Sequence, residues 1–167
     1  GLMLAISRVF DGITDPVIGF LSDRFKTRWG RRKPFVLIGL PIYILGVWLL
    51  WIPPIEFGEV TWFGISFNIG YPYLLLVLMI MYIGATIKDV PYSAWGAELA
   101  TDYNERTLVM SWKEAFTVAG SLIGALTPAM LVFWGYTKPT DNVYFLTIAI
   151  AIIMPILVLN MLVSVPE

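Results

Sequence analysis

Three charged side chains lie close together in an otherwise apolar stretch near the start of the chain. Asp11 and Asp15 are four residues apart, so on a helix both carboxylates project from one face, with Arg8 one turn earlier on nearly the same side. A charge at the centre of a membrane helix costs about 2.5–3.5 kcal/mol on insertion scales, so we expect this face to line a bundle interior or an aqueous cavity. The alternative is a structural ion pair between Arg8 and Asp11, which leaves Asp15 without a local partner.

The same stretch is rich in oxygen ligands. Pro16 has no N–H and therefore frees the carbonyl of Gly12 one turn earlier, while Thr14 adds a hydroxyl. Together with two carboxylates, these hard donors suit a small hard cation such as Na⁺, by the logic that matches oxygen ligands to Mg²⁺ and Ca²⁺. The acids could equally carry a proton, because burial and a like-charged neighbour both favour the neutral acid. The residues by themselves leave Na⁺ and H⁺ open.

A second charged cluster follows in the stretch TIKDVPYSAWGAEL, residues 86–99. Neighbouring residues on a helix point about 100° apart, so we expect at least one of Lys88 and Asp89 to be free for another partner. The alternative is a pair that cancels its own charge at a proline kink. An aspartate beside Tyr92 and Trp95 is suited to sugar recognition, because carboxylates accept hydrogen bonds from hydroxyl groups and aromatic rings stack on the apolar face of a sugar.

The composition indicates membrane helices as the elements that carry these clusters. The chain of 167 residues is 58% hydrophobic and 14% charged, against about 45–50% and about 25% in soluble domains, and its mean hydropathy is +0.78. Each apolar block is close to the roughly 20 residues that cross a bilayer. We therefore predict an all-α membrane protein with spans at about 1–22, 35–53, 71–99, 109–134 and 143–165.

The distribution of charge predicts the topology. Six of the eleven basic residues lie in the connection at about 23–34, which places it in the cytoplasm by the positive-inside rule. The connection at about 54–70 has two glutamates and no Lys or Arg, so we expect it outside, as an external loop or interfacial segment. The loop at about 100–108 is then cytoplasmic and that at about 135–142 external.

Several functions have no support in the composition. The chain has no cysteine and no histidine, which removes thiol nucleophiles, Cys/His zinc sites, disulfides and imidazole catalysis. Nothing supports nucleic acid binding. We interpret Gly39, Gly46 and the GxxxG pair Gly120/Gly124 as helix packing positions. For Lys113, near a cytoplasmic end, snorkelling is the simple alternative to a functional role.

Two long stretches carry a combination of motifs. RVFDGITDPVIGFLSDRFKTRWGRRKPF contains D-x-x-x-D-P and GRRKPF, and DVPYSAWGAELATDYNERT contains PY-x-A-x-G-x-E-L-x-x-D-x-x-E-R-T. In this order and spacing they closely resemble the glycoside-pentoside-hexuronide:cation symporters, the melibiose-permease-like branch of the major facilitator superfamily. The resemblance covers nearly the whole chain. It implies a twelve-helix transporter of two six-helix bundles, of which this chain is a partial N-terminal bundle, helices two to six.

The resemblance also implies partners and site residues. The partners are a small-molecule sugar or glycoside, the lipid bilayer, and helix one and the C-terminal half of the same protein, which we expect to be missing here. No cofactor is implied besides the coupling ion, Na⁺ or H⁺. The cation-binding residues that match the family are Asp11, Thr14, Asp15 and Thr86.

For the substrate, the resemblance implies Asp89 and a basic residue on the next helix, for which Lys113 is the nearest match. Tyr92, Ser93 and Trp95 lie nearby, with Ser93 where the family has an aromatic residue. Melibiose permeases have arginine at the position of Lys113. Because lysine lacks the bidentate fork of arginine, we expect a hydroxyl pattern other than that of melibiose.

The first basic loop matches the superfamily pattern G-x-x-x-D-R…G-R-R. In the superfamily this loop helps to close the cytoplasmic side, although a basic loop can also be a topology determinant only. Residues expected in this charge network or gate are Arg8, Gly19, Asp23, Arg24, Arg31, Arg32, Glu98 and Arg106.

The function that follows is cation-coupled symport of a sugar or glycoside by alternating access in a bacterial cytoplasmic membrane. The alternative is a related transporter of a non-sugar substrate, such as a lysolipid or a drug-like compound. An intramembrane enzyme is less favoured, because paired hydrolytic aspartates usually come from facing helices, whereas Asp11 and Asp15 share one helix. A non-transporting sensor would bind without accumulating substrate.

Overall fold

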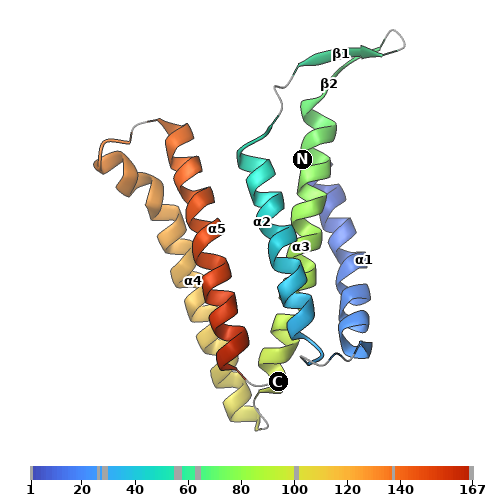
Figure 1. Ribbon diagram of the computed structural model, residues 1–167, viewed down its shortest axis with the longest axis vertical. Helices are drawn as coiled ribbons and strands as arrows, with labels where there is room; N and C mark the ends of the chain where they lie inside the picture. Colours follow the sequence, from blue (N-terminus) through green and yellow to red (C-terminus); the bar gives the residue numbers. More distant parts are fainter. Residues whose placement is uncertain are drawn as a thin grey trace. The chain divides into compact units, whose positions relative to one another are not determined.

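The computed structural model of this protein describes the backbone of residues 2–25, 27, 30–54, 58–62, 65–99, 102–136 and 138–165, with their side chains except at 2–11, 59–62, 65–68 and 139. Within these residues the chain forms five helices and one hairpin (Figure 1). Their bounds are α1 Leu2–Arg24, α2 Lys33–Trp51, β1 Glu59–Trp62, β2 Ile65–Asn68, α3 Gly70–Glu98, α4 Tyr103–Phe133 and α5 Pro139–Ser164. The predicted all-α fold class is confirmed.

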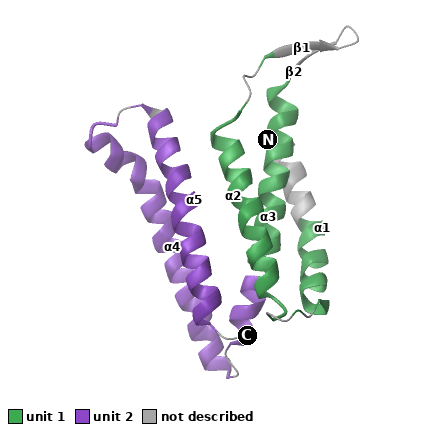
Figure 2. Cartoon of the chain, viewed as in Figure 1, with its two compact units in different colours: residues 1–91 green, residues 92–167 purple. Residues whose placement is uncertain are grey.

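Two compact units divide the chain, one of residues 1–91 and one of residues 92–167 (Figure 2). The first unit contains α1, α2, the hairpin and most of α3. The second contains the last turns of α3 with α4 and α5. The boundary falls inside α3, directly after Pro91.

Four of the helices are long and apolar enough to cross a membrane, by length and composition alone. Among the described residues these are α2, α3, α4 and Thr140–Ser164 of α5, with mean hydropathies of 2.0, 1.8, 1.8 and 2.7. Helix α1, which carries Arg8, Asp11 and Asp15, is not one of the four. A fifth membrane crossing by α1 therefore stays a prediction.

Helices α4 and α5 begin earlier than predicted. The apolar blocks that predicted them start at residues 109 and 143, whereas the helices start at Tyr103 and Pro139. Asp102 precedes α4 in an extended conformation and Glu105 lies in its first turn, where an acid interacts favourably with the helix dipole. Pro139 opens α5, at a position where its missing N–H costs no hydrogen bond. Polar first turns extend both helices beyond the stretch that hydropathy detects.

Helix α4 ends in a Schellman motif. Gly135 has a φ of 94°, a left-handed conformation that glycine adopts without steric cost. The N–H of Gly135 donates to the carbonyl of Val132 at 3.0 Å, and the N–H of Tyr136 donates to the carbonyl of Leu131 at 3.0 Å. The chain therefore leaves the helix sharply at the loop predicted for 135–142.

The connection between α2 and α3 contains a hairpin that the sequence analysis did not predict. Strand β1 pairs with β2 antiparallel, in a register that sets Glu59 opposite Asn68 and Trp62 opposite Ile65. The β-branched residues Val60, Thr61 and Ile65 favour this conformation. Short length and mixed polarity hid the strands within what we expected to be an external loop or interfacial segment.

Glycines bring the backbones of α2 and α3 together within the first unit. A Cβ added at Gly39 would meet the backbone N of Lys88 at 2.7 Å, one at Gly46 would meet Cα of Met81 at 2.6 Å, and one at Gly84 would meet Cα of Tyr43 at 2.7 Å. As positions advance along α2, their partners on α3 recede, so the two helices are antiparallel. Gly39 and Gly46 are packing positions, as expected.

Further along, the Tyr73 hydroxyl on α3 donates a hydrogen bond of 2.7 Å to the carbonyl of Leu49 on α2.

The environment of Gly120 and Gly124 on α4 differs from that of the α2 and α3 glycines. No described atom lies within 4 Å of a Cβ added at either position. The GxxxG packing predicted there therefore has no partner among the described residues.

We predict that Gly84→Ala destabilises the protein by about 1–3 kcal/mol, the usual cost of overpacking, because a methyl group there overlaps the backbone of α2. Gly96→Ala on the same helix is the matched control, since its nearest atom is the flexible end of Met110 at 3.8 Å. Thermal unfolding in detergent micelles, followed by tryptophan fluorescence, measures both. Equal melting temperatures for the two variants would contradict this account of the α2–α3 contact.

Candidate functional site

The residues expected to bind the coupling cation belong to α1 and α3 of the first unit. Thr14 is half-buried and Asp15 is exposed on α1, and Thr86 on α3 is buried at 6% exposure. The side chains of Arg8 and Asp11 lie outside the described residues. Among the described side chains, no group of three or more acids could hold a metal ion. The proposed ligand set, which includes Asp11, thus stays a prediction.

Lys88 and Asp89 form a cluster with an aromatic residue of α2. The ammonium of Lys88 donates to the Oδ1 of Asp89, and the same Nζ lies 5.1 Å from the ring centroid of Tyr43. The side chain of Lys88 is 12% exposed and that of Asp89 is 57% exposed. The structure therefore has the self-cancelling pair that the sequence left as the alternative. The pair forms although adjacent helix positions point about 100° apart, because the flexible four-carbon stem of Lys88 lets its ammonium reach the carboxylate of Asp89.

Four of the five residues expected to bind substrate meet in the second unit. Tyr92, Ser93, Trp95 and Lys113 line one cavity of about 240 Å³, although they come from two helices. The ammonium of Lys113 donates a hydrogen bond of 3.0 Å to the Ser93 hydroxyl. The same Nζ lies 5.8 Å from the ring centroid of Tyr92, within the range of a cation–π contact. Asp89, the fifth residue, belongs to the first unit.

The remaining wall of this cavity is apolar. Trp95 is nearly fully buried, at 3% exposure. Apolar or small residues complete the lining, namely Gly96, Leu99, Val109, Met110, Phe116, Met161 and Val165. The cavity thus combines the ammonium of Lys113 and the hydroxyl-bearing residues Ser93 and Tyr92 with aromatic and aliphatic surface. Such a site can bind a ligand with one polar and one apolar face.

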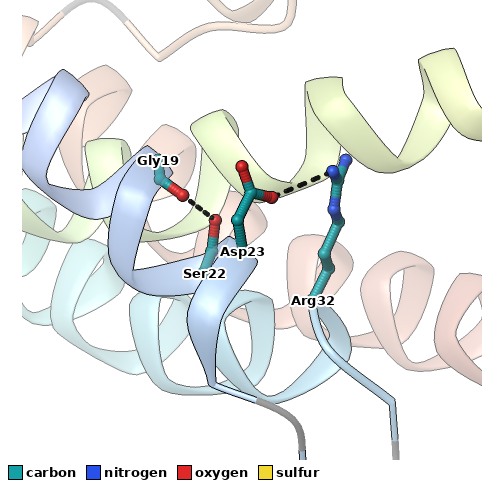
Figure 3. Close-up of polar contacts among 4 residues, drawn as sticks. All are labelled: Gly19, Ser22, Asp23 and Arg32. Carbon is teal, nitrogen blue, oxygen red and sulfur yellow. Dashed lines mark hydrogen bonds and ion pairs between the residues drawn. The ribbon is translucent and has the colours of Figure 1, made fainter.

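Within the expected gate, one ion pair joins α1 to the start of α2. The Nη2 of Arg32 lies 3.2 Å from the Oδ1 of Asp23, and the Arg32 side chain is 5% exposed against 61% for Asp23 (Figure 3). One residue before the aspartate, the Ser22 hydroxyl donates a hydrogen bond of 2.9 Å to the carbonyl of Gly19. The buried guanidinium of Arg32 is thus paired with the solvent-exposed carboxylate of Asp23.

The other residues of the expected gate belong to both units of the chain. The guanidinium of Arg24 lies 5.6 Å from the ring centroid of Phe20, and Arg31 is half-buried. Glu98 and Arg106 are exposed in the second unit. The side chain of Arg8 is outside the described residues. The structure therefore connects Asp23 with Arg32 and leaves the wider network a prediction.

Two positions that matter for the Lys88–Asp89 cluster were missed in the sequence. Tyr43 places its ring at the Lys88 ammonium, and Gly84 lets the backbone of Tyr43 approach α3. A signal was present, because Gly39, Tyr43 and Gly46 recur at i, i+4 and i+7 and so share one face of α2. The two glycines were expected to be packing positions, and no role was expected for the tyrosine between them.

Comparison with known proteins identifies the family. The family model described as MFS/sugar transport protein matches residues 1–166. The chain belongs to this family. It is an integral membrane protein, and its family and relatives are transporters. The resemblance to the major facilitator superfamily is confirmed.

Three relatives illustrate the range of the family. An inner membrane symporter of Escherichia coli K12 is 31% identical over 143 residues, 83% of this chain and 29% of the relative. A protein of the same organism, named as a putative glycoside/cation symporter, is 33% identical over 124 residues, 73% of this chain and 25% of the relative. A sodium-dependent lysophosphatidylcholine symporter of Danio rerio is 30% identical over 133 residues, which are 78% of this chain and 23% of the relative. This chain therefore spans about a quarter of the length of each of these relatives.

For the Asp23–Arg32 pair, we predict that Asp23→Asn lowers stability by about 1–3 kcal/mol, because the buried guanidinium loses a charged acceptor. Arg24→Gln in the same motif is the control, with an expected change within about 0.5 kcal/mol for an exposed side chain. Chemical denaturation in detergent measures both. A loss for Arg24→Gln as large as that for Asp23→Asn would contradict a specific role for the pair.

Proposed function

We propose that the protein containing this chain couples the uptake of a sugar or glycoside to a cation by alternating access. The observation that carries the proposal is the cavity in which Lys113, Ser93, Tyr92 and Trp95 meet. An ammonium donates hydrogen bonds to sugar oxygens, a serine hydroxyl both donates and accepts, and aromatic rings stack on the apolar face of a sugar. Asp89, which precedes this cluster on α3, would accept hydrogen bonds from sugar hydroxyl groups.

Asp11, Thr14, Asp15 and Thr86 would form the cation site of this transporter. A bound Na⁺ or proton neutralises the paired aspartates, which lowers the cost of carrying them through a closed state in low dielectric. Coupling is reciprocal, so the substrate must tighten cation binding by the same factor by which the cation tightens substrate binding. In this scheme the cation is a second substrate of the transporter.

The arrangement of the whole transporter follows from the family resemblance. This chain would supply helices two to six of twelve, and a first helix and a second bundle would complete the pathway, since alternating access rocks one bundle against the other. The Asp23–Arg32 pair, with Arg24, Arg31, Glu98 and Arg106, would close the cytoplasmic side. The E. coli inner membrane relative supports a bacterial cytoplasmic membrane as the location.

We predict that Asp15→Cys in the full-length protein abolishes cation-coupled accumulation, because one carboxylate of the cation site is lost. The stimulation of substrate binding by the cation, typically about 5- to 150-fold in coupled systems, should disappear. Radiolabelled uptake into proteoliposomes under imposed Na⁺ or H⁺ gradients measures this. Asp141→Cys, an exposed acid in the first turn of α5, is the control. Full coupled accumulation by the Asp15 variant would reject the cation site.

A second candidate is the transport of an amphiphile such as a lysolipid. The apolar part of the cavity, with Leu99, Val109, Phe116 and Met161, favours a ligand with an acyl chain, and Lys113 could bind the phosphate of its headgroup. The Danio rerio relative is named for such a substrate.

A competition experiment separates the two candidates. Transport of a sugar predicts that members of a panel of mono- and disaccharides inhibit uptake or bind the purified protein, and that lysophosphatidylcholine below its critical micelle concentration does not. Transport of a lysolipid predicts the reverse. Lys113→Met should weaken binding by roughly tenfold in either case, as expected for loss of one charge-assisted hydrogen bond.

A further inference from the structure

Lys88 lies between the two helices of the α2–α3 contact. Its side chain is 12% exposed, its ammonium donates to the Oδ1 of Asp89, and its Nζ is 5.1 Å from the ring centroid of Tyr43. An ammonium so enclosed in a membrane helix needs compensation for its lost hydration. The carboxylate supplies the negative charge, and the ring face supplies a second favourable electrostatic contact.

The backbone geometry keeps this arrangement in place. Gly39 lets α2 approach the backbone N of Lys88, and Gly84 lets the backbone of Tyr43 approach α3. A side chain at either glycine would separate the helices and withdraw the ring from the ammonium. Two close backbone contacts, Gly39 with Lys88 and Gly84 with Tyr43, therefore keep the ring of Tyr43 near the Lys88 ammonium.

The pair changes what Asp89 can bind. A carboxylate has about four lone-pair sites, and the Lys88 ammonium uses Oδ1, so acceptors remain for hydroxyl groups. At 57% exposure the carboxylate can reach a ligand. Its charge, however, is balanced by the Lys88 ammonium, which also faces the ring of Tyr43. A neutral hydroxyl donor is then accepted, whereas a cation meets the like charge of Lys88.

We propose that Lys88 determines ligand charge in this transporter: positioned by Tyr43, it excludes protonated amines from Asp89 and leaves that carboxylate to neutral hydroxyl donors. The proposal rests on the proposed function, in which Asp89 binds a sugar. It assigns Lys88 a role in specificity and Tyr43 a positioning role. Neither residue was among the substrate residues expected from the sequence.

The first experiment compares matched neutral and cationic sugars. Binding of glucose with glucosamine, and of galactose with galactosamine, is measured on the full-length protein at a pH where the amines are protonated. Lys88→Met should shift the affinity ratio toward the amino sugar by roughly tenfold, as expected when one charge-assisted hydrogen bond becomes available. Lys88→Arg should retain the wild-type ratio. Lys138→Met, the same change in the loop before α5, is the matched control and should leave the ratio unchanged.

Tyrosine variants separate the positioning role from general damage. Tyr43→Phe keeps the ring face and should keep the wild-type ratio. Tyr43→Leu removes the ring and should shift the ratio in the same direction as Lys88→Met, although by less. An unchanged ratio in both Lys88→Met and Tyr43→Leu would overturn the proposal, even if overall affinity falls.

A second measurement decides on Lys88 without any substrate. This chain has no cysteine, so Asp89→Cys introduces a single reporter thiol into it. Labelling rates are compared for a cationic and an anionic methanethiosulfonate reagent. Adding Lys88→Met should raise the cationic-to-anionic rate ratio by roughly tenfold, because the local positive charge is gone. Failure of all four sugars to bind would reject the sugar proposal alone, whereas an unchanged labelling ratio would reject the role of Lys88.

Discussion

The close approach of α2 and α3 at Gly39, Gly46 and Gly84 is the contact on which the described first unit depends. In a bilayer the lipid tails are as apolar as leucine, so helices associate through close packing and interhelical polar contacts and gain little from hydrophobic burial. Here the absent side chains let the backbones meet, and the Tyr73–Leu49 hydrogen bond extends the contact toward the ends of the helices. The contact between Lys88 on α3 and the ring of Tyr43 on α2 depends on this close spacing of the two helices.

Three of the described basic side chains each have a polar partner close by. Lys88 pairs with Asp89, Arg32 pairs with Asp23, and Lys113 donates to Ser93 beside the ring of Tyr92. Each basic side chain reaches an acceptor by its own flexibility, which reduces the cost of removing it from water. The same contacts leave polar atoms and aromatic faces beside exposed or cavity-lining positions, where a ligand could use them.

Hydropathy predicted the helices well and their ends less well. Apolar blocks of about 20 residues, close to the thickness of a bilayer, predicted all five described helices, although α1 is not among the four that are apolar enough to cross a membrane. Hydropathy missed the polar first turns of α4 and α5, since an acid in each first turn interacts favourably with the helix dipole and no hydropathy window selects such residues. It also missed the β1–β2 hairpin, where strands of four residues are too short to show a clear alternation.

The sequence by itself determined the membrane class, the five helices, the family and the residue types of the candidate sites, because these depend on contiguous composition and on motifs within single segments. Only the tertiary structure decided which distant side chains meet. Lys113 and Ser93 are 20 residues apart and come from different helices, and the Tyr43 ring reaches Lys88 across a glycine contact. Such encounters depend on the rotation and separation of packed helices. No periodicity within one helix specifies them.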